Sequence, residues 1–193
     1  MIYRREVDGL RAVAVVPVML FHAGVQQFSG GYVGVDIFFV ISGYLITSIL
    51  IAELEAGHFS VARFYERRAR RILPALLLVM ACCIPAAWLL MLPNEFLDFG
   101  QSLVAVTLFV SNILFWKEDG YFAEAAELKP LLHTWSLAVE EQYYVLFPLF
   151  LMLVWRFGRQ RVFWMIVALA AASLVASEWG WRHKPSANFY LVP

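Results

Sequence analysis

Six apolar segments follow one another along this chain of 193 residues, and most of them approach the length of a membrane span. They lie at residues 10–26, 33–52, 72–92, 102–116, 135–154 and 162–179. Because a helix needs about 20 apolar residues to cross the hydrocarbon core of a bilayer, the pattern predicts an all-α, polytopic transmembrane helix bundle of about six spans. The fourth segment is short, and Pro17 in the first segment removes one helical hydrogen bond and is expected to kink that span.

The composition agrees with a membrane protein. Hydrophobic residues make up 62% of the chain and charged residues only 16%, and the mean hydropathy is +0.69. The formal net charge is zero, so no excess of positive charge points to nucleic acid as a partner. Arg4 and Arg5 before the first segment resemble the start of a signal peptide, but no small-residue cleavage site follows, which favours an uncleaved first span.

Arginine residues indicate the topology. The densest positive cluster lies at 63–71, between the second and third segments. By the positive-inside rule this loop and the N-terminus are both expected in the cytoplasm, which agrees with two intervening spans. Six spans would put Arg156, Arg159 and Arg161 outside, against the same rule, unless the segment at 102–116 is not a full span. Without repeats or linkers, residues 1–193 are expected to form one portion of a single domain.

Two ionisable side chains, those of Arg11 and His22, interrupt the first apolar segment. Removing their water costs several kcal/mol unless partners or a wet cavity compensate. The eleven residues between them turn a straight helix by about 1100°, within about 20° of full turns, and raise it by about 16 Å. Both side chains are therefore expected on one face of the span, as parts of a site.

Four motifs, in order along the chain, resemble those of the acyltransferase 3 family. They are Arg11 and His22 separated by ten residues, and the runs GGYVGVDIFFVISGYLI at 30–46, FYERRARRILPAL at 64–76 and HTWSLAVEEQYY at 133–144. The resemblance implies a multi-pass enzyme of the bacterial inner membrane. Such an enzyme moves an acyl group, acetyl in the expected case, from cytoplasmic acetyl-CoA to a hydroxyl of a surface glycan such as lipopolysaccharide O-antigen. No permanently bound cofactor or metal ion is implied. The family's membrane domain resembles a bundle of about ten helices, so further helices of the same domain are expected as partners of this segment.

Within that resemblance, His22 is the expected general base or acyl-carrying nucleophile, because imidazole serves either role near neutral pH. Arg11 is expected to hold an anionic part of coenzyme A, since guanidinium pairs bidentately with phosphate. An ion pair with Asp8, three residues earlier, is the structural alternative. Arg68 and Arg71 form the family's Arg-x-x-Arg pair and are expected to bind the donor's phosphate groups. Their alternative role is to anchor the loop at the cytoplasmic face.

Three further polar residues are candidates for supporting roles. Glu140 is the acid of the family's Trp-Ser-Leu-x-x-Glu pattern, which implies support of the imidazole or binding of acceptor hydroxyls, and its alternative is a cap-region acid. Asp36, early in a span, is expected to orient the imidazole or pair with an arginine unless it lies solvated at the outer interface. Ser42 is expected to hydrogen-bond within or between helices, with Gly34 and Gly43 allowing close helix approach.

Other chemistries have less support in the sequence. The adjacent Cys82 and Cys83 lack the spaced partners of a redox or zinc motif, the histidines lack metal-ligand spacing, and no glycine-rich nucleotide motif is present. Arg11, His22 and Asp36 would also suit the ion or proton path of a transporter or channel. An inactive partial acyltransferase domain is the third alternative.

Overall fold

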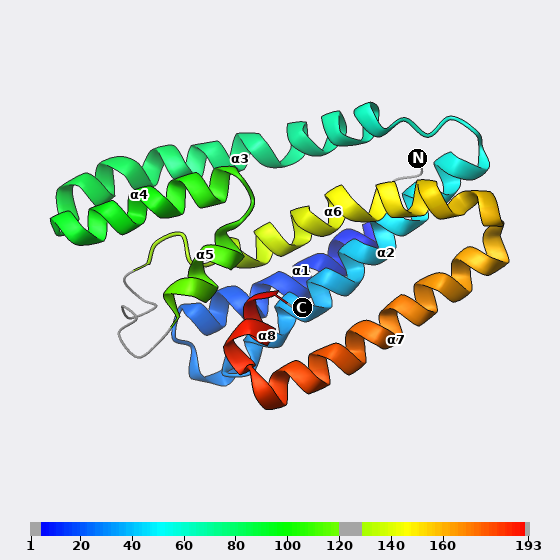
Figure 1. The fold of residues 1–193 in the computed structure, drawn as a ribbon. Coiled ribbons are helices and arrows are strands. Elements are labelled where there is room, and N and C mark those ends of the chain that lie inside the picture. Colours follow the sequence, from blue (N-terminus) through cyan, green and yellow to red (C-terminus); the bar gives the residue numbers. More distant parts are fainter. Residues whose placement is uncertain (1–4, 120–128, 192–193) are drawn as a thin grey trace. The chain divides into compact units, whose positions relative to one another are not determined.

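The computed structural model describes residues 5–119 and 129–191, and every regular element in these two stretches is helical. This confirms the predicted all-α class. By contacts the chain divides into two compact units, Met1–His58 and Phe59–Pro193. The α-helices of the described stretches are α1 (Arg5–His22), α2 (Gly34–Glu55), α3 (Val61–Leu90), α4 (Pro93–Thr107), α5 (Ser111–Glu118), α6 (Thr134–Val154), α7 (Arg159–His183) and α8 (Pro185–Leu191) (Figure 1).

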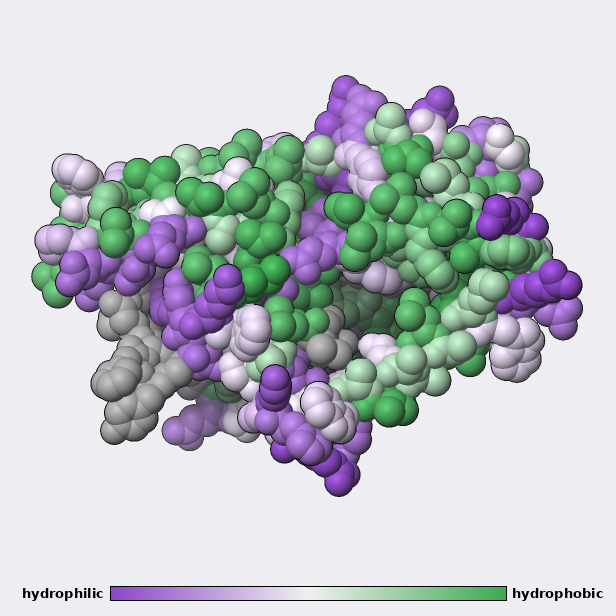
Figure 2. Space-filling model, viewed as in Figure 1, coloured by the Kyte–Doolittle hydropathy of each residue, from purple (hydrophilic) through white to green (hydrophobic). Residues whose placement is uncertain are grey.

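Four helical stretches are long and apolar enough to cross a membrane. They are Gly31–Glu55, Val61–Leu90, Thr134–Phe157 and Arg159–His183, and they correspond to the predicted segments at 33–52, 72–92, 135–154 and 162–179. Helix α1, which holds most of the first predicted segment, is not among them and carries charged residues in its first two turns. Apolar side chains cover much of the surface of the long helices (Figure 2), as expected for a multi-pass membrane protein.

In the first unit, α1 and α2 form an antiparallel hairpin joined by two short 3₁₀ turns, η1 (Gln26–Phe28) and η2 (Gly31–Val33). A Cβ atom at Gly34 would lie 2.0 Å from the carbonyl oxygen of Ala14, and one at Gly31 would lie 2.2 Å from that of Pro17. No side chain fits at either position, so α2 begins in direct backbone contact with α1. The close approach predicted at Gly34 is confirmed, whereas the one predicted at Gly43 is wrong, because a Cβ atom there would meet no described atom within 4 Å.

These glycines give a matched test of helix packing. Gly34→Ala is expected to destabilise the protein by roughly 1–3 kcal/mol, because the added methyl group overlaps the α1 backbone and forces the helices apart. Gly43→Ala, in the middle of the same helix, is the control and is expected to be neutral or to stabilise by up to about 1 kcal/mol, because alanine restricts the unfolded chain. The measurement is the free energy of unfolding of the purified protein in detergent. Equal effects at the two positions would contradict the close packing of α1 on α2.

The second unit begins with α3, the longest helix of the described chain. Its N-terminus is capped by Ser60, whose hydroxyl accepts a hydrogen bond from the backbone N–H of Arg63 at 3.4 Å. Because α2 ends at Glu55 and α3 begins at Val61, the basic cluster at 63–71 lies within α3. The interpretation of this cluster as a loop is therefore wrong, and its arginines have fixed helical positions instead.

Helix α4 folds back along α3 (Figure 1). Pro93 starts α4 at a position where the missing N–H has no helical partner, and Glu95 accepts a hydrogen bond from the backbone N–H of Leu92 at 2.8 Å. One apolar core cluster of the unit consists of Leu76, Met80, Ala87, Phe99, Val106 and Leu131. This packing fixes α4 on α3, and with it the turn that follows α4.

The fourth predicted segment, 102–116, is not one helix. Helix α4 ends at Thr107 and α5 begins at Ser111, with Phe109 between them at a φ of 53°. This left-handed conformation is uncommon for a residue with a side chain and stops the helical hydrogen-bond ladder. Of the two alternatives that the sequence leaves open, the structure therefore bears out the one in which this segment is not a full span, and the cause is backbone geometry that residue composition does not reveal.

Helix α6 is the most buried of the long helices. The 3₁₀ turn η4 (Trp155–Phe157) and Gly158, at a φ of 88°, lead from α6 into α7. Helix α7 is largely exposed, and its C-terminal end contacts α8, which packs against α5 and α6 as well.

Candidate active site

An arginine of α3 and two glutamates of α6 form a largely buried ionic cluster. Arg68 Nη2 lies 3.3 Å from Glu141 Oε1 and donates a hydrogen bond to it, and it lies 3.9 Å from Glu140 Oε1. The side chain of Arg68 is only 13% exposed, and those of both glutamates are 10% exposed. Charges that leave water to this extent require partners. Two carboxylates here share one guanidinium.

Tyr144 completes this cluster, which we call the Arg68 cluster (Arg68, Glu140, Glu141 and Tyr144). The guanidinium carbon of Arg68 lies 3.6 Å from the centre of the buried Tyr144 ring, a cation–π arrangement. The Tyr144 hydroxyl, one helical turn from Glu140, donates a short hydrogen bond to the Glu140 carboxylate. The ring and the carboxylates together restrict the guanidinium. Its Nε atom is buried and has no hydrogen-bond partner among the described residues.

Helical spacing brings these groups together. Glu140, Glu141 and Tyr144 occupy adjacent positions of α6, and the face of α3 that meets them carries Tyr65 and Arg68 at a spacing of three. The Tyr65 hydroxyl donates a hydrogen bond to the Val145 carbonyl oxygen at 2.8 Å. The two contacts, one ionic and one to the backbone, hold α3 in register with α6.

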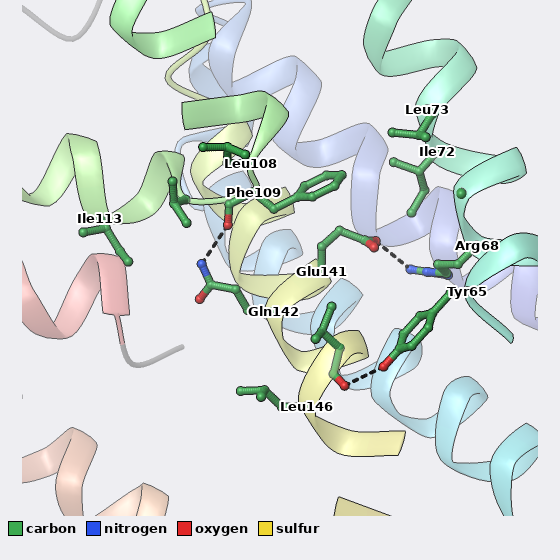
Figure 3. Close-up of a pocket in the computed structure, with 13 residues that line it drawn as sticks. Tyr65, Arg68, Ile72, Leu73, Leu108, Phe109, Ile113, Glu141, Gln142 and Leu146 are labelled. Carbon is green, nitrogen blue, oxygen red and sulfur yellow. Dashed lines mark hydrogen bonds and ion pairs between the residues drawn. The ribbon is translucent and has the colours of Figure 1, made fainter. Parts of the chain in front are cut away.

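A cavity of about 580 Å³ opens beside the Arg68 cluster (Figure 3). Its lining comes from α3, from α6 and from the turn between α4 and α5, and most of it is apolar. Arg68, Glu141 and Gln142 are its polar contributions, together with Tyr65. The remaining lining residues are Ala69, Ile72, Leu73, Leu108, Phe109, Val110, Ile113, Val145 and Leu146.

Gln142 forms hydrogen bonds to the wall of this cavity that comes from the turn between α4 and α5 and the start of α5. Its Nε2 atom donates hydrogen bonds to the Phe109 carbonyl oxygen at 2.8 Å and to Asn112 Oδ1 at 2.9 Å. Asn112 is buried and donates in turn to the Tyr190 carbonyl oxygen at 3.2 Å. The left-handed residue Phe109 is thus stabilised by α6, so one helix carries both the ionic cluster and the support of the cavity wall.

The predicted donor-binding residues have different surroundings. Arg71 is exposed one turn after Arg68, and its neighbour Arg70 forms an exposed ion pair with Glu66 at 2.7 Å. In the first unit, Arg11 is half-buried, with its guanidinium carbon 4.9 Å from the centre of the Phe38 ring. Of the predicted site residues, Arg68 and Glu140 lie close together, with Arg68 Nη2 3.9 Å from Glu140 Oε1.

The other predicted residues lie in the first unit. His22 is the last residue of α1, is exposed, and has its ring 5.1 Å from that of Phe21. Asp36 is exposed in the first turn of α2. Ser42 is buried, and the hydrogen bond predicted for its hydroxyl is not present in the described residues.

Sequence reasoning missed Glu141, Tyr144 and Gln142 as site residues. A signal was available, because Tyr144 follows Glu140 by four residues and therefore lies on the same helical face. The apolar residues around them in α6 also leave these polar groups to find partners within the protein. What the pattern did not reveal is which neighbouring helix supplies the cation.

Comparison with known proteins decides the family. A family model described as an acyltransferase domain matches residues 4–193. The chain belongs to the acyltransferase 3 family. This confirms the resemblance carried by the four motifs. No solved structure matches this member of the acyltransferase 3 family.

Two relatives of this acyltransferase 3 chain come from Staphylococcus aureus. The O-acetyltransferase OatA is 37% identical over 174 residues, which are 89% of this chain and 29% of OatA. The putative O-acetyltransferase SAS0844 is 40% identical over 150 residues, which are 77% of this chain and 25% of the relative. The chain therefore spans less than a third of the length of the relatives it matches.

The Arg68 cluster predicts unequal effects of removing its members. Arg68→Met leaves two carboxylates side by side with no cation and is expected to cost about 3–5 kcal/mol of stability. Glu140→Gln leaves the Arg68–Glu141 pair balanced and is expected to cost much less. The measurement is the free energy of unfolding in detergent, with Arg182→Met, in the exposed pair with Glu178, as a control expected to stay within about 1 kcal/mol. Equal losses for Arg68→Met and Glu140→Gln would contradict the shared-cation arrangement.

Proposed function

We propose that this chain is part of a membrane O-acyltransferase that moves an acetyl group from acetyl-CoA to a hydroxyl of a cell-surface glycan, with lipopolysaccharide O-antigen as an example. The observation that carries the proposal is the family match over residues 4–193, together with relatives named as O-acetyltransferases. The long apolar helices support a reaction at a membrane, and the buried ionic cluster beside a cavity is the kind of arrangement that binds a substrate.

The reaction requires a proton acceptor and a site for the donor. In the proposed step the hydroxyl oxygen bonds to the acetyl carbon, the carbon–sulfur bond breaks, and the hydroxyl proton passes through an imidazole to the departing thiolate. We assign the imidazole to His22, whose exposed position leaves it open to substrate. A variant of the step has His22 itself carry the acetyl group between donor and acceptor.

The remaining predicted residues have supporting roles in this proposal. Arg11 and Arg71 contact anionic parts of the donor, because guanidinium binds phosphate with two parallel hydrogen bonds. Arg68 and Glu140 build the fixed end of the cavity in the second unit. Asp36 and Ser42 belong to the helix that packs on α1, and we assign them the support of the catalytic helix.

We further propose that the N-terminus lies in the cytoplasm of a bacterium and that the protein resides in the inner membrane. The break between α4 and α5 supports a cytoplasmic position for Arg156, Arg159 and Arg161, because it removes the crossing that placed them outside. With α3 leading outward and α6 leading back, these arginines and the basic N-terminal part of α3 share the cytoplasmic side, in accord with the positive-inside rule.

Transfer of label tests the proposed activity. Membranes that contain the protein are expected to move radiolabelled acetyl groups from acetyl-CoA to the glycan fraction. His22→Ala is expected to abolish the transfer while membrane abundance stays near normal, because an exposed side chain contributes little to packing. His58→Ala, which removes another exposed histidine, is the matched control and should transfer at the unchanged rate. Full transfer by a well-expressed His22→Ala variant would remove His22 from the mechanism, and uptake of the label without transfer would favour a transporter.

Arg71 provides a separate test of donor binding. Arg71→Lys is expected to raise the KM for acetyl-CoA several-fold, because lysine keeps the charge but loses the paired geometry of guanidinium. Arg70→Lys is the control, since Arg70 is exposed on the same turn and already pairs with Glu66. The measurement is the initial rate at varied acetyl-CoA concentration. An unchanged KM in Arg71→Lys would return Arg71 to the role of a membrane anchor.

A further inference from the structure

The charges of the Arg68 cluster influence which ligands the adjacent cavity can bind. One guanidinium faces two carboxylates within 3.9 Å, so the positive charge of Arg68 already has its partners within the protein. Among the described residues that line the cavity, Arg68 and Glu141 are the charged ones. A phosphate group placed there would meet an arginine that is already neutralised, and it would lie close to Glu141. The cavity therefore disfavours the anionic part of a nucleotide.

The walls of the cavity favour a mainly apolar ligand. Its apolar lining residues include Ile72 and Leu73 of α3, Leu108 and Ile113 near the α4–α5 turn, and Leu146 of α6. Its volume of about 580 Å³ lies within the usual range for small-molecule sites. The polar end combines acceptors on Glu141 with N–H donors on Arg68, and both residues line the cavity. This combination matches the N–H and C=O groups of an amide.

We infer that this cavity holds the uncharged pantetheine arm of acyl-CoA, with an amide of the arm at Arg68 and Glu141 and the phosphates outside it. The arm has amide groups separated by short alkyl segments and carries no charge, so it fits both the polar end and the apolar walls. Arg71, exposed one helical turn from Arg68, is then the residue of this pair that meets phosphate. The inference rests on the proposed function and divides the Arg-x-x-Arg pair into an arm-binding and a phosphate-binding member.

Two fragments of the donor separate these roles. Acetyl-pantetheine carries the arm without phosphates, and adenosine 3′,5′-bisphosphate carries phosphates without the arm. Binding of each to the protein in lipid nanodiscs is measured by calorimetry. Leu146→Trp, which places a large ring at the cavity wall, is expected to weaken acetyl-pantetheine by about tenfold or more and to leave the bisphosphate unchanged. Arg71→Gln is expected to have the opposite pattern.

A matched control lies on the same helix. Leu153 has a similar exposure to Leu146, 63% against 67%, and is not part of the cavity lining, so Leu153→Trp should bind both fragments as the unaltered protein does. Ile72→Phe, on the opposite wall, provides a second cavity variant in case Leu146→Trp does not fold, and it should also weaken acetyl-pantetheine. The unfolding temperature of each variant identifies any loss that comes from misfolding.

The possible results distinguish the inference from the proposed function. If acetyl-CoA binds and label is transferred, but both cavity variants bind acetyl-pantetheine normally, the assignment of the cavity is overturned and the function stands. If the cavity variants instead lose a co-purifying phospholipid, the cavity holds a lipid chain and the inference fails. If the unaltered protein binds neither donor fragment and transfers no label, both proposals fail.

Discussion

The pairing of Arg68 with two glutamates is the interaction on which the second unit depends. A guanidinium removed from water must keep its partners, and Glu140, Glu141 and the Tyr144 ring supply them from three positions of one helix. The need to keep Arg68 beside its two glutamates determines how α3 lies on α6, because a shift of either helix by one turn would separate the guanidinium from the carboxylates. It also leaves little freedom for Arg68 to move toward a ligand. In this unit, charge neutralisation therefore contributes to helix register as well as to the character of the cavity.

The second constraint is the interruption between α4 and α5. Phe109 adopts a left-handed conformation that is unfavourable for its residue type, and Gln142 compensates by donating a hydrogen bond from its amide N–H to the Phe109 carbonyl oxygen. Because Gln142 follows Glu141 directly, the support of this turn and the ionic cluster are linked through neighbouring residues of α6. The cavity lies beside both, and it is lined by α3, by α6 and by this turn.

Much of the fold could be predicted from the sequence, because hydrophobic runs near span length have few alternatives to helices. Four predicted segments match long apolar helices, and Gly34 was recognised as a point of close approach. The sequence left open whether the segment at 102–116 is a full span, because apolar composition is the same in one helix and in two, whereas the break lies in the backbone of Phe109 and its hydrogen bond from Gln142. The basic cluster at 63–71 was interpreted as a loop because its charge outweighed its good helix formers.

In the site, the motifs indicated Arg68 and Glu140 as separate candidates, but their contact depends on the pairing of helices more than seventy positions apart. Glu141 and Tyr144 were missed for the same reason.

The contacts of Gly31 and Gly34 have a mechanical consequence for the first unit. Gly31 in η2 meets the carbonyl oxygen of Pro17, and Gly34 at the start of α2 meets that of Ala14, so the two contacts on α1 are separated by about one turn of helix. Two contacts along the helix axis oppose rotation of one helix against the other as well as sliding, so we expect the two helices of the hairpin to move as one rigid body. Because Arg11 and His22 lie on α1, which moves with α2, a tilt of α2 would move both residues while they stay three helical turns apart. Displacement of this hairpin would therefore move both residues together.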